Sequence, residues 1–240
     1  MVSDRMAVVL ALLDGDLDRG ADLRALAAAR AAVALGVDGI CAGLGTGASG
    51  MVLAWGGETI SIELEQVQFA LGQGPGLDAA AGVPVLVPDV VEAMARWPVF
   101  VPAALALGVR AVFALPLRIG AIGVGVLMAH RTSPGVLAGG ALVDALALAD
   151  AVTVLLLREQ SGWTQQATSA MGGAWPGHAR PGTYRAQVHQ ATGMISVQLG
   201  VSLAEALVRL RARAFAEGRP IAEIAADVVA RRLRFEEHDR

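Results

Sequence analysis

The sequence predicts two units of different fold class: an α+β domain with an antiparallel sheet and covering helices, followed by an all-α three-helix bundle. Up to about residue 158, short β-rich runs alternate with helical stretches, which is typical of α+β domains. Residues 183–233 show amphipathic helical patterns throughout. Between them, residues 159–182 are rich in glycine and proline, as flexible linkers are. We therefore expect domains at 1–158 and 183–240, joined by that linker.

The expected strands of the first domain are short runs of β-branched or alternating residues bounded by glycine or proline. They cover residues 40–42, 49–55, 59–64, 83–87, 111–117 and 122–130. The pair at 49–55 and 59–64 flanks Gly56 and Gly57, so we expect a hairpin there. Pro84 predicts that its strand lies at a sheet edge, because proline donates no ladder hydrogen bond.

The expected helices of this domain lie in stretches rich in alanine and leucine. They cover residues 21–35, 65–71, 77–81, 91–107 with breaks at Pro98 and Pro102, and 134–159 with its preceding loop. The most apolar stretch, residues 141–157, contains Asp144 and Asp150 and is shorter than the ~20 residues that cross a bilayer. We expect a buried helix there.

The N-terminal residues 1–13 contain Asp4 and Arg5 and lead into further acidic residues. A secretory signal peptide has a different layout, with a basic start and an uninterrupted apolar stretch. We therefore expect a cytoplasmic protein.

The C-terminal domain has well-marked helix boundaries. A first helix is expected over residues 183–199. Ser202 and Glu205 form a capping-box pattern, in which the hydroxyl accepts the N–H of residue 205 and the carboxylate reaches back, so a second helix begins there. Gly218 ends that helix. Pro220 begins a third helix at a first-turn position, where its missing N–H costs nothing.

Each of these helices has one apolar face, with residues three and four positions apart. The faces comprise Val188, Ala191, Ile195 and Leu199; Leu203, Ala206, Leu207, Leu210 and Ala214; and Ile221, Ile224, Ala225, Val228, Val229 and Leu233. A single helix of this length is marginal in water, because most helical stability comes from packing. The three faces together predict a small bundle.

Charge is distributed unevenly between the two domains. Residues 1–158 carry nine arginines and fourteen carboxylates, a net charge of −5, whereas residues 183–234 carry eight arginines and four carboxylates, a net charge of +4. The positive charge favours nucleic-acid binding by the C-terminal domain, because phosphates attract cationic side chains.

No feature of the sequence predicts catalysis. Cys41 is the only cysteine, which excludes intramolecular disulfides and cysteine-rich metal sites. The four histidines show no metal-ligand spacing. The glycine-rich residues 72–76 lack the lysine that follows a phosphate-binding P-loop. We therefore expect no catalytic residue, no metal and no cofactor.

Two C-terminal segments, HQATGMISVQLGVSLAEALVRLRARA and GRPIAEIAADVV, resemble the ANTAR domain of bacterial antitermination regulators. The resemblance covers nearly all of residues 187–233. It implies RNA binding, specifically to paired stem-loops in a nascent leader transcript, which prevents the terminator hairpin from forming.

The resemblance also implies that Ala191, Gly193 and Met194 help to form the surface presented to an RNA loop. Gly193 lies inside the first helix, where glycine costs about 1 kcal/mol relative to alanine. The alternative explanation for Gly193 is tight packing against a neighbouring helix. Thr192 stands where the family commonly has lysine, which removes one phosphate contact.

In the second helix, Arg209, Arg211 and Arg213 are the candidates for phosphate contact and for stacking on an unpaired base. Arg211 belongs to the family pattern LR-x-x-A. The alternative is ordinary pairing of charges on the helix surface. Glu205 is four residues before Arg209, and Glu217 is four residues after Arg213. Leu207 stands where the family frequently has an aromatic residue, so base stacking is lost there.

The first domain carries a second resemblance, over residues 23–158. The segments LGQGPGLDAA, VPVLVPDV, RWPVF and GVRAVFALPLRIGAIGVGVL resemble the GAF domain in the form joined to ANTAR modules in actinobacterial proteins. This implies a sensor and dimerisation module. Five residues are candidates for lining a small-molecule pocket: Trp55, Asp78, Asp89, Trp97 and Phe100. Alternatively, Trp97 and Phe100 are core residues, and Asp78 and Asp89 cap helices or turns.

These observations predict a signal-responsive, homodimeric RNA-binding regulator with no enzymatic activity. One alternative is a protein-interaction or dimerisation module that has a GAF sensor and no longer binds RNA. A second is a GAF-type sulfoxide reductase, which the single Cys41 disfavours because a dithiol cycle needs a second thiol.

Overall fold

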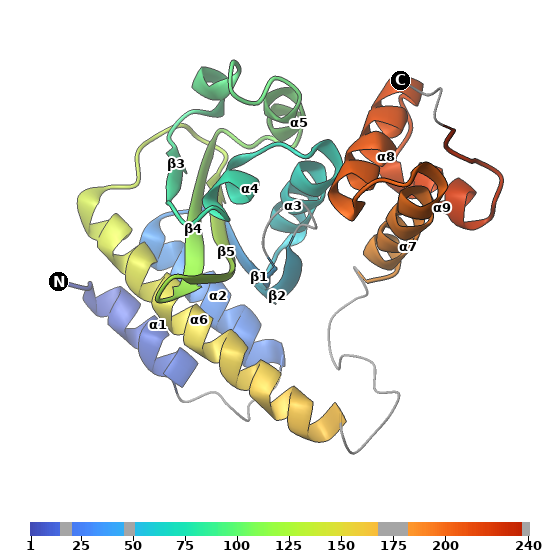
Figure 1. The fold of residues 1–240 in the computed structure, drawn as a ribbon. Coiled ribbons are helices and arrows are strands. Elements are labelled where there is room, and N and C mark those ends of the chain that lie inside the picture. Colours follow the sequence, from blue (N-terminus) through green and yellow to red (C-terminus); the bar gives the residue numbers. More distant parts are fainter. Residues whose placement is uncertain (15–20, 46–50, 168–181, 237–240) are drawn as a thin grey trace. The chain divides into compact units, whose positions relative to one another are not determined.

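The computed structural model describes residues 1–14, 21–45, 51–167 and 182–236. The chain forms two compact units, an N-terminal and a C-terminal one, which are described separately. The N-terminal unit contains the following elements in chain order: α1 (Asp4–Asp14), α2 (Ala21–Leu35), β1 (Gly39–Leu44), β2 (Val52–Gly56), α3 (Thr59–Leu71), α4 (Pro75–Ala79), β3 (Val85–Val87), the 3₁₀ helix η2 (Val90–Ala93), α5 (Phe100–Ala106), β4 (Ala111–Ile119), β5 (Ile122–Arg131) and α6 (Gly139–Ala167) (Figure 1).

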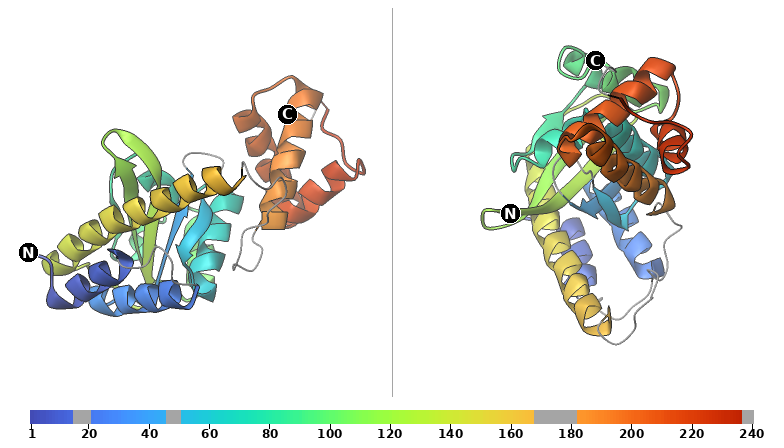
Figure 2. Two further views of the ribbon diagram at one scale, coloured as in Figure 1. Left: turned by 90° about the horizontal axis from the view of Figure 1, so that it is seen from below. Right: turned by 45° about the vertical axis from the view of Figure 1, so that its right-hand side comes forward.

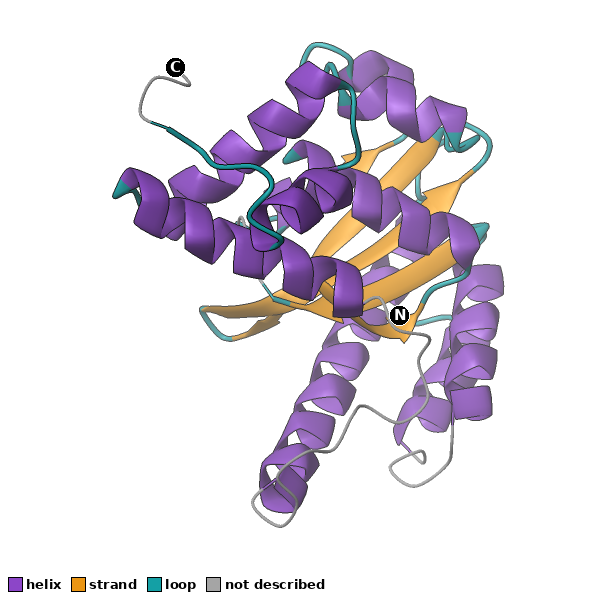
Figure 3. Ribbon diagram, turned by 90° about the vertical axis from the view of Figure 1, so that its right-hand side faces the viewer, coloured by secondary structure: helices purple, strands orange, loops and turns teal. Residues whose placement is uncertain are grey.

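The five strands form one antiparallel sheet in the order β2-β1-β5-β4-β3 (Figure 3). Strands β4 and β5 are a hairpin whose last pair is Ile119 and Ile122, and Gly120 takes the positive φ of the turn. Strand β3 begins directly after Pro84 and lies at an edge of the sheet, as predicted. The α+β fold class expected for this domain is confirmed.

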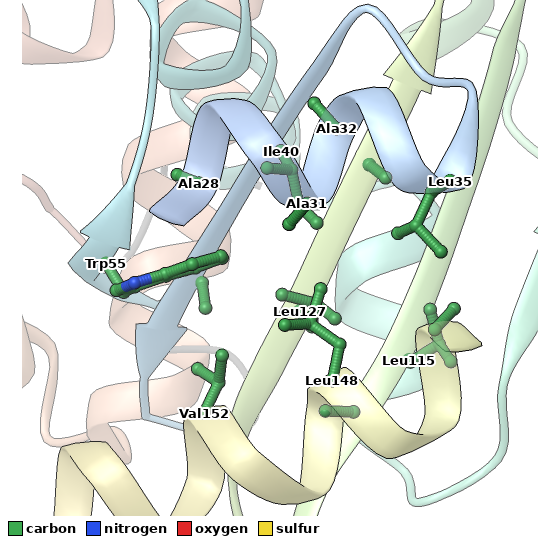
Figure 4. Close-up of a cluster of buried hydrophobic side chains, with 14 of the residues drawn as sticks. Ala28, Ala31, Ala32, Leu35, Ile40, Trp55, Leu115, Leu127, Leu148 and Val152 are labelled. Carbon is green, nitrogen blue, oxygen red and sulfur yellow. The ribbon is translucent and has the colours of Figure 1, made fainter. Parts of the chain in front are cut away.

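Helices α2 and α6 cover one face of the sheet, and α1 packs on both of them. The core on this side joins small side chains of α2, such as Ala31, to Leu127 of β5 and Leu148 of α6 (Figure 4). Trp55 of β2 closes one end of this core. Alanines let α2 approach the sheet closely, so an alanine-rich helix of low amphipathicity is still well buried.

The other face of the sheet carries α3 and α4. Ser61 of α3 lies beside His130 of β5, and Gln68 of α3 donates to the Met128 sulfur of the same strand. Trp97 and Phe100 are buried next to one another, with ring centroids 6.0 Å apart in an edge-to-face arrangement. The prediction that these two aromatic residues are core residues is therefore confirmed.

The strand predicted at residues 59–64 is wrong, because this segment is the start of α3. Its six-residue alternation is part of a longer helical pattern, in which Ser61, Leu64, Glu65, Gln68 and Phe69 are buried at three- and four-residue steps. The Glu58 carboxylate accepts the Ser61 N–H at 2.9 Å and so helps to start the helix. Helix α1 was not predicted either.

Helix α6 continues to Ala167, so it extends into the predicted linker. The rest of that linker, residues 168–181, lies outside the described residues.

By length and composition, the segment Gly139–Arg158 of α6 could cross a membrane, yet 44% of its most apolar 18-residue stretch is buried inside the domain. The helical segments Arg185–Leu199 and Leu203–Glu217 pass the same test only as a pair bent by 106°. Asp144 of α6 is buried and accepts both the backbone N–H and the hydroxyl of Ser3.

The C-terminal unit consists of α7 (Gly182–Leu199), α8 (Leu203–Glu217) and α9 (Ile221–Val229), which pack on one another as a bundle (Figure 2). The Ser202 hydroxyl accepts the Glu205 N–H at 3.2 Å, as the capping pattern predicts. Gly218 has the left-handed conformation of a helix end. The predicted all-α bundle is confirmed.

The predicted buried faces hold with a few exceptions. Leu203 is 61% exposed, because it is the first residue of α8 and no turn precedes it. Helix α9 ends at Val229, so Leu233 is outside the helix and only half-buried. Phe235 is buried in the bundle instead, and its N–H donates to the Gln198 side chain at 3.0 Å.

Candidate nucleic-acid interface

Arg209 and Arg213 of α8 each form an exposed ion pair one helical turn away. Arg209 lies 2.7 Å from the Glu205 carboxylate, and Arg213 bonds to Glu217. Both are the i,i+4 pairs expected from the sequence, and exposed pairs of this kind contribute little to stability. Because these pairs are weak, a phosphate can compete with them. Arg211 is half-buried on a different side of the same helix.

A second group of charges belongs to the fold of the bundle. Arg219, in the turn after α8, contacts Glu217 at 3.2 Å, Glu223 at 3.4 Å and Asp227 at 2.8 Å. Arg232 contacts the other oxygen of Asp227 at 2.7 Å. A hydrogen bond from Arg219, and to a smaller extent one from Arg232, holds the pKa of Asp227 below its ordinary value. Arg219 therefore joins α8 to α9 and contacts three carboxylates at once, whereas Arg232 pairs with Asp227.

Gly193 of α7 lies half-exposed beside Met194. A Cβ placed on Gly193 would meet nothing within 4 Å in the described structure. The backbone there is ordinary right-handed helix, because Gly193 is not among the residues with positive φ. Tight packing against a neighbouring helix, the alternative explanation for this glycine, is therefore wrong. The bare backbone at this position is open to an incoming molecule.

The five ligand candidates of the N-terminal domain make contacts that belong to the fold. Trp55 belongs to the core between the sheet and α2 and α6. Asp78 pairs with Arg96 at 2.7 Å, and that guanidinium stacks over Trp97 at 4.8 Å. Asp89 caps η2, accepting the Val91 N–H at 3.1 Å, and pairs with Arg110 at 2.9 Å. The contacts of both aspartates are structural, and Arg110 lowers the pKa of Asp89.

Two cavities are present elsewhere in this domain. The first, between the sheet and α3 and α4, has a volume of about 20 Å³ and is lined by residues that include Met51, Glu65, Gln68 and Met128. A space of this size holds about one water molecule. The second is an open apolar groove of about 440 Å³ between α1 and α6. None of the five candidates lines either cavity.

Two polar side chains lie beside the buried ring of His130. His130 Nδ1 is 3.3 Å from the Ser61 hydroxyl and 3.7 Å from the Glu58 carboxylate. Burial lowers the pKa of His130, although Glu58 and Asp38 oppose that shift. Burial also raises the pKa of the Cys41 thiol, so the thiolate is disfavoured. Within the described residues, no group of three or more histidine, cysteine or acidic side chains is placed to hold a metal ion.

Comparison with protein families locates one domain. Residues 183–229 match the ANTAR domain. This segment covers α7, α8 and α9, so the match and the bundle coincide. An ANTAR domain implies an RNA-binding antitermination regulator. No curated protein matches the sequence of this chain.

Several solved GAF-type structures are similar to the N-terminal unit. A GAF domain of a phosphoenolpyruvate-protein phosphotransferase of Coxiella burnetii is 15% identical, with 68% of this chain and 99% of that chain covered and a TM-score of 0.49. The corresponding Acinetobacter GAF domain is 13% identical, with 68% and 99% covered and a TM-score of 0.48. The free methionine-R-sulfoxide reductase of Neisseria meningitidis is 20% identical, with 68% and 96% covered and a TM-score of 0.46.

Three ANTAR positions singled out from the sequence lie inside the bundle. Ala191 and Leu207 are buried core residues, so their side chains are not part of the outer surface. Thr192 is also buried, and its hydroxyl donates to the Val188 carbonyl at 2.7 Å. The remaining candidates, Gly193 and Met194 of α7 and the α8 arginines, are at least partly accessible.

Phe215 is an exposed aromatic residue of α8 to which the sequence patterns assigned no role. It lies outside the buried stripe of that helix, which ends at Ala214. An apolar side chain that falls off the 3.6-residue stripe is a signal that could have drawn attention to it.

Proposed function

We propose that this chain is a signal-responsive, RNA-binding regulator of transcription antitermination that acts in the cytoplasm. In this proposal the C-terminal bundle binds paired stem-loops in nascent leader transcripts and keeps the terminator hairpin from forming. The observation that carries the proposal is the ANTAR match over residues 183–229, which falls on a three-helix unit of net positive charge.

The proposed RNA contacts come from two neighbouring helices, α7 and α8. Gly193 offers bare backbone with open space around it, and Met194 lies beside it. Arg209, Arg211 and Arg213 supply cationic groups for phosphates and for stacking. Exchanging an exposed Arg–Glu pair for an Arg–phosphate contact costs little, because the pair contributes little to stability. Ala191 and Leu207 contribute indirectly, by fixing the distance between the helices.

The N-terminal GAF-like domain is proposed to be the sensor, in the form that accompanies ANTAR modules in actinobacterial proteins. Its smaller cavity holds about one water molecule, so a small-molecule ligand would bind there only after Met51 or Gln68 moves. A ligand that opens this cavity would therefore change the packing of α3 on the sheet. That coupling is the proposed input of the regulator.

A homodimer is proposed to form through α6. Val143, Leu146 and Val154 are exposed large side chains on this helix, and Val154 also lines the apolar groove beside α1. Asp14 and Arg158 lie at the same groove and pair with each other at 3.6 Å. Apolar surface of this kind is typical of protein–protein contacts.

The second candidate function is a protein-interaction or dimerisation module that no longer binds RNA. The observation that favours it is the pairing of Arg209 and Arg213 with glutamates, which reduces the positive potential of α8. Sulfoxide reduction is less well supported, since Cys41 is buried and its raised pKa disfavours the reactive thiolate.

The test of the proposal is binding of the full chain to a two-hairpin leader RNA from its own genome. A scrambled-loop RNA and a plain duplex of equal length are the controls. The proposal predicts tighter binding to the two-hairpin RNA than to either control. Equal binding to all three, or none, would reject it and leave the interaction module.

A further inference from the structure

Phe215 differs from every other phenylalanine of the chain in its exposure. The chain has five phenylalanines. Four of them are at most 6% exposed, whereas Phe215 is 69% exposed. Single exposed apolar residues are common on protein surfaces, so exposure alone indicates little. The residues beside Phe215 on the surface of α8 are what indicate a function for it.

Phe215 belongs to an exposed apolar stripe along the outside of α8, opposite the buried face of this helix. We call this set the outer stripe, and it comprises Ala204, Val208, Ala212 and Phe215. Val208 is 57% exposed. Residues three, four and seven positions apart share one face of a helix, so these four side chains line up. The buried face consists of Ala206, Leu207, Leu210 and Ala214.

Arginines border the outer stripe on both sides. Arg211 is four residues before Phe215 and therefore its neighbour on the helix surface. Arg209 is three residues before Ala212 and borders the stripe on the other side. An apolar strip with a guanidinium group on each side is suited to unpaired nucleotides, whose bases are flat and apolar and whose phosphates are anionic.

A protein helix is a poorer match for this surface than RNA is. Two of the four stripe residues are alanines, so Val208 and Phe215 are its only large side chains. Interfaces between proteins favour clusters of large apolar residues with charged residues excluded from the centre. Here the stripe is one residue wide, and the unit that carries it has a net charge of +4 over residues 183–234.

We propose that Phe215 is a stacking platform for an unpaired base of the bound RNA, with Arg209 and Arg211 contacting the flanking phosphates. This inference rests on the RNA-binding function proposed above and specifies where the base lies. It moves the stacking position away from residue 207, which is buried in the bundle, to the outer stripe. Aromatic stacking tolerates any base, so specificity for the loop would come from other contacts.

The test uses the full chain and the two-hairpin RNA, with one loop adenine replaced by a fluorescent analogue that is quenched on stacking. The variants are Phe215→Ala, Phe215→Leu and Phe215→Tyr, compared with Arg209→Ala. Phe215→Ala and Phe215→Leu are expected to lose roughly tenfold in affinity, within the about 5- to 150-fold range of a lost base stack. Phe215→Tyr keeps an aromatic face and is expected to stay within about twofold of wild type. Quenching is expected with wild type and the tyrosine variant only.

The outcomes separate this inference from the function on which it rests. If Phe215→Ala and Phe215→Leu bind as tightly as wild type while Arg209→Ala binds weakly, RNA binding stands and stacking on Phe215 is rejected. The inference is also rejected if the phenylalanine variants change the sedimentation of the protein but not its RNA affinity, because the stripe is then a protein contact. If wild type binds no RNA, both proposals fail. Since Phe215 is exposed, thermal unfolding of these variants should match wild type.

Discussion

Arg219 Nη2 lies 2.8 Å from Asp227 Oδ2, which joins the turn after α8 to the last turn of α9. The same arginine contacts Glu217 and Glu223, and Asp227 also contacts Arg232. Arg209 pairs with Glu205 of its own helix, and Arg213 pairs with Glu217, which Arg219 also contacts. Arg219 therefore belongs to a charge network that links α8 to α9, whereas Arg209 pairs within one turn of its own helix and can exchange partners.

This division predicts opposite effects for two arginine variants. Arg219→Ala leaves three carboxylates without their shared partner, so it should lower the melting temperature of the bundle. Arg209→Ala removes an exposed pair worth about 0.3–0.5 kcal/mol and should barely change it. RNA affinity should fall for Arg209→Ala. Thermal unfolding followed by circular dichroism and RNA titration of both variants provide the check. The division is wrong if Arg209→Ala is the more destabilising change.

Gly193→Ala should stabilise the protein and weaken RNA binding at the same time. The added methyl group meets no atom within 4 Å, and alanine is favoured over glycine in a helix by about 1 kcal/mol. The methyl group would, however, occupy the space through which RNA is proposed to approach the backbone. Gly200→Ala is the matched control, because Gly200 has φ +64° and alanine is strained there. A Gly193→Ala variant with unchanged RNA affinity would show that this surface is not used.

The stability of the N-terminal domain should depend on pH through His130. Burial lowers its pKa from the ordinary 6.5, so between the folded and the unfolded pKa the unfolded state binds more protons. The contribution of His130 is therefore complete above about pH 6.5 and is lost as the pH falls through the lowered value. Urea unfolding at pH 8 and pH 5 should show a smaller loss for His130→Gln than for wild type. Equal losses would show that another group controls the pH dependence.

Val154→Glu should dissociate the proposed homodimer without unfolding the protein. Val154 is exposed on α6 and lines the groove beside α1, so a carboxylate there would be buried against apolar surface in a dimer. Val91→Glu changes an equally exposed valine of η2 and is the control. Sedimentation velocity should give a monomer for the first variant and a dimer for the second. Identical sedimentation of both would place the interface elsewhere.

Much of the fold could be predicted because its signals are local. The capping pair Ser202 and Glu205 and the terminating Gly218 fix the second helix of the bundle to within a residue. The hairpin of β4 and β5 follows from two apolar runs around Gly120. In contrast, residues 59–64 alternate like a strand over six residues, and only burial against the sheet shows that a helical period governs them.

The candidate site was harder to predict because it depends on which side chains remain outside the packed core. Sequence similarity singled out Ala191 and Leu207, and packing places both inside the bundle. The bare surface at Gly193 and the exposure of Phe215 follow from the three-dimensional arrangement of α7, α8 and α9. Trp55 and Asp89 are engaged in separate structural contacts, whereas Asp78, Trp97 and Phe100 lie together through Arg96 and a ring contact; composition alone does not show this.

The most direct test of RNA binding by α8 is the salt dependence of affinity for the two-hairpin RNA. Each phosphate contact to a single strand contributes about 0.7 to the slope of log affinity against log salt. We predict that affinity falls with salt for wild type, and that Arg209→Ala, Arg211→Ala and Arg213→Ala each reduce the slope by about 0.7. Binding that is independent of salt, or slopes that none of the three substitutions changes, would contradict the proposal that this helix contacts RNA.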